Sequence, residues 1–78
     1  MIKLTNIQRS NNKISVDVES HETQPYQKYQ LIFDIYTEAY EASIPNPDKF
    51  GVLKIIHKLS SYITEGKPLP EIDCIACY

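Results

Sequence analysis

The run from Asn46 to Gly66 constrains the fold most strongly, because it carries the start, stripe and stop signals of one amphipathic helix. Asn46 is placed as an N-cap, Pro47 at the first helical position and Asp48 in the first turn. Gly66 supplies a left-handed stop before two prolines. The apolar residues recur at helical spacing, namely Val52, Ile56, Leu59 and Ile63, with Leu53 and Ile55 beside them. The pattern predicts a helix with one face buried.

Four segments before this helix are predicted to be strands, at residues 2–9, 13–19, 28–36 and 39–44. The second alternates cleanly, with Ile14, Val16 and Val18 on one side and polar residues between them. The first changes parity between Leu4 and Ile7, so we expect either a bulge near Thr5-Asn6 or an Ile7 side chain on the second face.

The third and fourth segments are predicted to form a hairpin around a two-residue turn at Thr37-Glu38. This connection sets apolar residues opposite one another on a single face, in the pairs Ile35–Tyr40, Phe33–Ala42 and Leu31–Ile44. It also sets Asp34 opposite Glu41 on the other face. Nothing nearby suggests desolvation of these two carboxylates, so we interpret them as a solvated acidic patch rather than an acid–base pair.

Residues 71–78 are predicted to form a last strand with apolar side chains on both faces. This strand either runs parallel to the fourth strand or lies antiparallel to the first, at the other edge of the sheet. The expected fold is α+β, an antiparallel β-sheet in the order β-β-β-β-α-β with the amphipathic helix packed on one face. The 78 residues are expected to make a single small domain, residues 1–78.

Composition argues against several classes of partner. The formal net charge of −2 leaves no basic footprint, so nucleic acid is an unlikely partner. No apolar run approaches the roughly 18–20 residues of a spanning helix, and the first residues lack the apolar stretch of a signal peptide, so we expect no membrane association. Two cysteines do not make a disulfide framework, and a cytoplasmic location is expected.

Cys74 and Cys77 form the one C-x-x-C motif of the chain. In a strand, positions three apart point to opposite faces, so two small buried side chains are the favoured interpretation. A small metal or thiol site built on Cys74, Cys77 and His57 is the alternative. No catalytic residue, metal ligand or cofactor is predicted, and an enzymatic activity is not favoured.

Apolar side chains on the helix-free sheet face or the terminal strand would make a contact surface. The residues expected there are Ile32, Tyr36, Ile75, Cys77 and Tyr78. The alternative is that Ile7 and Ile75 belong to different edges of the sheet and no patch exists. The leading hypothesis is a non-enzymatic protein-interaction or structural module that forms a homodimer or binds another protein.

A further alternative is binding of a ligand or of single-stranded nucleic acid on a tyrosine-bearing face. The chain has six tyrosines and no tryptophan, and aromatic rings stack on bases. The net charge counts against this alternative.

Overall fold

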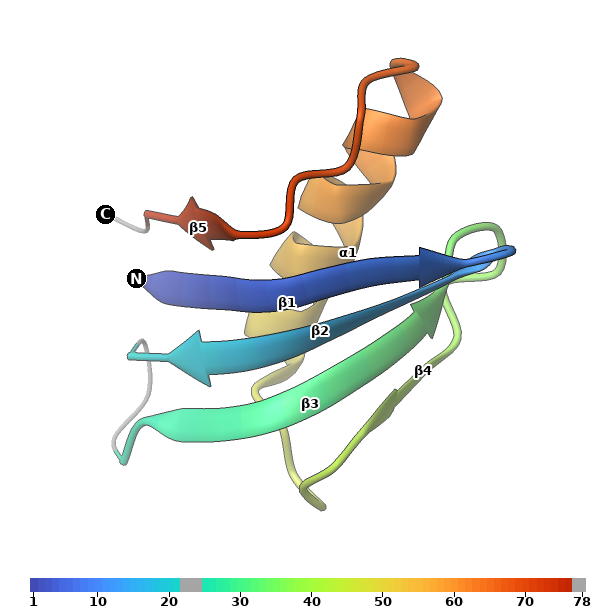
Figure 1. Ribbon diagram of the computed structural model, residues 1–78. Helices are drawn as coiled ribbons and strands as arrows, with labels where there is room; N and C mark the ends of the chain where they lie inside the picture. The colour runs from blue at the N-terminus through green and yellow to red at the C-terminus, as the bar shows by residue number, and fades with distance from the viewer. Residues whose placement is uncertain (22–24, 77–78) are drawn as a thin grey trace.

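The computed structural model describes residues 1–21 and 25–76, which form one antiparallel sheet and one helix (Figure 1). The elements in chain order are β1 (Ile2–Ser10), β2 (Lys13–Ser20), β3 (Gln27–Asp34), β4 (Tyr40–Ala42), α1 (Lys49–Thr64) and β5 (Asp73–Ile75). The strands lie in the order β4-β3-β2-β1-β5, and every neighbouring pair is antiparallel. The predicted α+β fold and element order are confirmed.

The β1–β2 hairpin contains the predicted bulge. Its register shifts between Thr5 and Gln8, where β1 holds one residue more than β2. Asn6 takes up the extra length in a left-handed conformation with φ of 51°, which asparagine tolerates better than most residues. The Asn6 side-chain oxygen accepts a hydrogen bond from Gln8 Nε2 at 3.0 Å. The bulge restores the parity of β1, and Ile7 is therefore buried with Ile2 and Leu4.

The β3–β4 register differs from the prediction by two residues. Phe33 lies opposite Tyr40, and Leu31 lies opposite Ala42. The strands close at Asp34, whose N–H donates to the Ala39 carbonyl, so the loop is longer than the two residues expected. A shift of two keeps every side chain on its predicted face, because side chains alternate with a period of two. It does separate Asp34 from Glu41, which lies opposite Ile32 instead.

The helix begins two residues later than predicted. Asp48, not Asn46, is the N-cap, and its carboxylate accepts a hydrogen bond from the Gly51 N–H at 3.2 Å. Gln27 holds the preceding segment in place, because its side chain accepts from the Asp48 N–H and donates to the Asn46 carbonyl. Gly66 is left-handed, with φ of 69°, as predicted.

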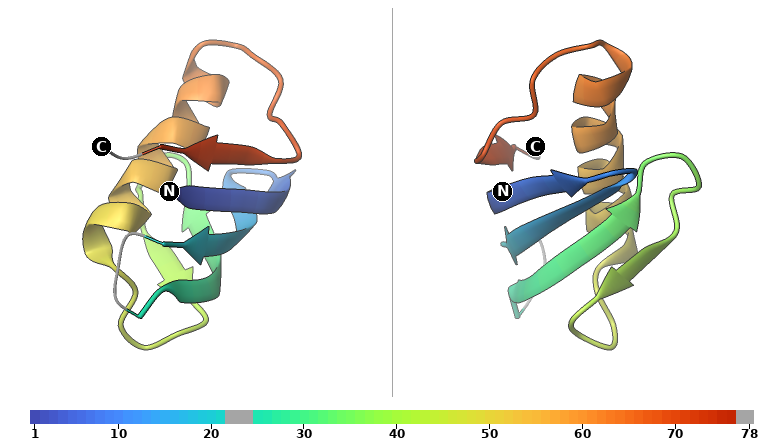
Figure 2. Two further views of the ribbon diagram at one scale, coloured as in Figure 1. Left: turned by 90° about the vertical axis from the view of Figure 1, so that its left-hand side faces the viewer. Right: turned by 45° about the vertical axis from the view of Figure 1, so that its right-hand side comes forward.

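The helix covers one face of the sheet, and Figure 2 shows the two layers edge-on. The helix contributes Val52, Ile55, Ile56 and Leu59 to the core, and Ile63 packs against it half-buried. The sheet contributes the remaining buried apolar side chains, namely Ile2, Leu4, Ile7, Ile14, Val16, Val18, Tyr29, Leu31 and Phe33. Among the described residues, no helix is long and apolar enough to cross a membrane.

The last strand pairs antiparallel with β1, which decides between the two positions left open by the sequence. It is shorter than predicted, spanning Asp73–Ile75 rather than residues 71–78. The register sets Ile75 opposite Ile2 and Cys74 opposite Lys3. Ile75 therefore faces the helix and packs against the core, and its predicted position on the helix-free face is wrong. Cys77 and Tyr78 lie outside the described residues.

We expect Leu59→Ala to lower the free energy of unfolding by about 2–5 kcal/mol, because Leu59 is fully buried between helix and sheet. Leu53→Ala is the matched control on the same helix, where the side chain is 38% exposed, and should cost less than about 1 kcal/mol. Urea denaturation followed by circular dichroism measures both. Equal losses would contradict the placement of the core.

Candidate interaction surface

The helix-free face of the sheet is mainly polar in the described part of the chain. Across it, Lys3 lies opposite Glu19, and Glu19 lies opposite Lys28. Ile32 is the large apolar side chain that emerges on this face, and it is 39% exposed. Because Ile7 and Ile75 both turn toward the core, the apolar patch predicted on this face is not present among the described residues.

The terminal strand also offers little to another chain. The Cys74 N–H donates to the carboxylate of its own neighbour, Asp73, at 2.8 Å. The other Asp73 oxygen accepts from the Tyr62 hydroxyl at 2.8 Å, and this hydrogen bond raises the pKa of Tyr62. A carboxylate that occupies an edge donor blocks addition of a further strand.

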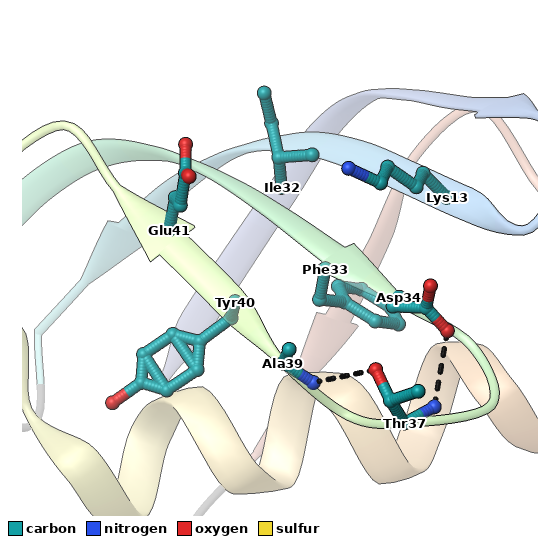
Figure 3. A pocket seen from close by; sticks show the side chains of 8 residues that line it. All are labelled: Lys13, Ile32, Phe33, Asp34, Thr37, Ala39, Tyr40 and Glu41. Carbon is teal, nitrogen blue, oxygen red and sulfur yellow. Dashed lines mark hydrogen bonds between the residues drawn. The ribbon is translucent and has the colours of Figure 1, made fainter.

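The loop between β3 and β4 presents the most exposed of the predicted interface residues. We call residues 35–39 the tyrosine loop. Tyr36 lies in it and is 74% exposed. Figure 3 shows the loop above the helix, with Asp34 and Thr37 bonded at its start and Thr37 bonded to Ala39 at its end.

The Asp34 carboxylate fixes the first half of the tyrosine loop. One oxygen accepts hydrogen bonds from the Tyr36 N–H at 2.8 Å and the Thr37 N–H at 3.0 Å. The other oxygen accepts from Asn12 Nδ2 at 2.7 Å, which ties the loop to the β1–β2 turn. The N–H groups of Thr37 and Tyr36 together hold the pKa of Asp34 below its usual value. This carboxylate acts as the acceptor of a local turn.

Backbone hydrogen bonds fix the rest of the loop. The Ile35 N–H donates to the Asn12 carbonyl at 2.8 Å, and the Glu38 N–H donates to the Asp34 carbonyl at 3.0 Å. Glu38 is left-handed, with φ of 64°, and the Thr37 hydroxyl accepts from the Ala39 N–H. A loop tied by this many bonds is ordered before any partner arrives.

The tyrosine loop lies next to the helix. Glu38 Oε1 is 3.6 Å from His57 Nε2, and both side chains are largely exposed. Tyr40 follows the loop at the start of β4, and its ring lies over the helix (Figure 3). One side of the molecule therefore displays a tyrosine, a glutamate and the outer face of the helix together.

A shallow pocket of about 190 Å³ lies beside the loop. It is lined by Lys13, Ile32, Phe33, Asp34, Thr37, Ala39, Tyr40 and Glu41. Its side chains do not converge on a common point, because Ile32 and Glu41 project to one side of the sheet and Phe33 and Tyr40 to the other (Figure 3). Small-molecule sites are usually about 300–1,000 Å³ with convergent polar groups, so the pocket does not fit that class.

The structure does not bring the alternative metal or thiol site together. His57 contacts the tyrosine loop on the β4 side of the sheet, whereas Cys74 is on β5, at the opposite edge. Cys77 is outside the described residues. The described part of the chain contains no group of three His, Cys, Asp or Glu side chains placed to hold a metal ion.

The tyrosines do not form a common stacking surface. Tyr26 precedes β3 and Tyr36 follows it, so these exposed rings are separated by a strand about 26 Å long, at about 3.3 Å per residue. Tyr29 is buried between them, and burial, with Asp48 and Tyr40 nearby, raises its pKa to about 12. Tyr78 lies outside the described residues.

Comparison with protein-family models, curated protein sequences and solved structures finds no match for this chain.

The sequence reasoning missed Phe50, which is 76% exposed in the first turn of the helix. A signal for it was present, because Phe50 is two residues before Val52. Two residues correspond to about 200° around a helix, which directs Phe50 away from the core. Leu53, assigned to the flank of the buried face, is also partly exposed.

We expect Asp34→Ala to lower the thermal midpoint, whereas Asp34→Asn, which keeps an acceptor oxygen, should lower it less. Because the pKa of Asp34 is lowered from 3.8 by folding, its charged form stabilises the fold above that value, and this contribution is lost as pH falls through the folded pKa. The difference between wild type and Asp34→Ala should therefore hold from pH 7 to 5 and shrink below about pH 4. Melting curves over this range measure it, and a difference that does not change with pH would contradict the assignment.

Proposed function

We propose that this chain is a non-enzymatic protein-interaction module that self-associates, and that the tyrosine loop is its contact element. The observation that carries the proposal is the pairing of a fixed backbone with an exposed ring. Asp34 holds the loop through hydrogen bonds to Tyr36 and Thr37, while the Tyr36 side chain stays 74% exposed.

This combination suits recognition. Tyrosine buries a large apolar area on contact, and its hydroxyl still forms hydrogen bonds. A loop that is already ordered loses little conformational entropy on binding, so more of the contact energy becomes affinity. The small core of the domain adds support, because small domains gain stability from a partner.

The loop chemistry favours binding over catalysis. A general acid needs a raised pKa, produced by burial or by a neighbouring carboxylate. Hydrogen bonds from two backbone N–H groups instead lower the pKa of Asp34 and occupy one of its oxygens. A cytoplasmic location is part of the proposal, because Cys74 is an exposed free thiol and a reducing compartment would keep it so.

Sedimentation equilibrium at micromolar concentration tests the proposal. We expect a dimer in the wild type and dimerisation about tenfold or more weaker in Tyr36→Ser, because a central tyrosine commonly dominates an interface. Tyr26→Ser removes another exposed tyrosine ring, at the far end of β3, and should leave the dimer unchanged. A wild-type monomer, or equal dimerisation of wild type and Tyr36→Ser, would refute the proposal.

A further inference from the structure

The outer face of the helix carries a second exposed aromatic side chain beside the tyrosine loop. Phe50, Leu53 and His57 succeed one another at spacings of three and four residues, so they lie along one side of the helix. Phe50 is 76% exposed, and Leu53 is partly exposed. We call these three residues, together with Lys54, the helix stripe. It is an apolar surface with a cationic border.

The charges of the helix and of the loop region are opposite. The helix contains three lysines, at positions 49, 54 and 58, and no Asp or Glu. Residues 34–41 contain three acidic residues, Asp34, Glu38 and Glu41, and no Lys or Arg. In a chain whose net charge is only −2, this separation concentrates positive charge on one element and negative charge on its neighbour.

The charges also decide what fits the helix stripe. Packing two copies helix against helix would bring the lysines of both together, and like charges oppose such a contact. An aromatic and acidic surface complements the stripe in both shape and charge. The tyrosine loop, with Tyr36 and Glu38, is such a surface, and every copy of the chain carries it.

We infer, resting on the proposed self-association, that a second copy of this chain covers the helix stripe. The tyrosine loop of each protomer docks on the helix stripe of the other, about a two-fold axis. Glu38 Oε1 and His57 Nε2 are 3.6 Å apart within one protomer, so loop and helix lie on one side of the molecule. A two-fold axis beside this contact brings both complementary pairs together at once.

The area required is compatible with these two elements. A stable interface buries about 800 Å² on each partner, which is about one sixth of the 5154 Å² accessible surface of this chain. Each protomer contributes both its loop and its stripe, so the surface is used twice. The exposed rings of Tyr36 and Phe50 supply the anchors, and the charges supply the orientation.

The first experiment compares Phe50→Ser with Ile72→Ser by sedimentation equilibrium. Ile72 is the matched control, since it is a large apolar side chain of similar exposure, 69%, next to β5 at the opposite edge of the sheet from the tyrosine loop. We expect Phe50→Ser to weaken dimerisation about tenfold or more and Ile72→Ser to leave it unchanged. Both residues are exposed, so circular dichroism should show both variants folded.

The second experiment reverses one charge on each element. Glu38→Lys makes the loop cationic, and Lys54→Glu makes the stripe acidic, so each variant alone should dimerise weakly. Mixed in equal amounts, they should form a heterodimer close to wild-type affinity, because the reversed loop of one meets the reversed stripe of the other and the unaltered pair also matches. Raising the salt concentration should weaken the wild-type dimer.

The outcomes separate this inference from the proposal beneath it. A monomeric wild type sinks both. A wild-type dimer that ignores Phe50→Ser and shows no gain on mixing the charge variants sinks only the inference, because self-association then uses another surface and the stripe faces a different partner. Loss on Phe50→Ser together with recovery on mixing supports it.

Discussion

The burial of one sheet face under a single helix is the constraint on which the rest of this structure depends. An isolated helix of 16 residues is marginal in water, so packing of its apolar face must hold it in place. Val52, Ile56 and Leu59 are fully buried against the sheet. Because the described chain has only this one covering layer, the opposite sheet face must remain compatible with water, and its rows of lysines and acidic residues reflect that requirement.

A single left-handed residue in β1 makes this division of faces possible. Without the extra residue at Asn6, the alternation that buries Ile2 and Leu4 would direct Ile7 into solvent. The bulge returns Ile7 to the core. It thereby removes an apolar side chain from the surface on which a contact patch was expected. The same residue thus completes the core and leaves the helix-free face polar.

Much of this architecture could be predicted from the sequence, because alternation and helical spacing report directly on burial. The bulge, the strand faces and the C-terminal stop at Gly66 followed from such patterns. The β3–β4 register did not, because the apolar matches of the two-residue turn survive a shift of two. What decides the register is the Asp34 carboxylate, which gathers the N–H groups of Tyr36 and Thr37 and enlarges the loop.

The candidate surface was harder to predict, because it depends on which strands are neighbours. Tyr36 was identified from its residue type, and the structure places it in a loop rather than in a strand. The direction of Ile75 depends on its pairing with Ile2, which local pattern does not determine. Phe50 is apolar on the outside of a helix that already has a complete buried face. Such a residue costs the free chain solubility and gains nothing for its core, so it indicates a contact that the isolated subunit leaves unmade.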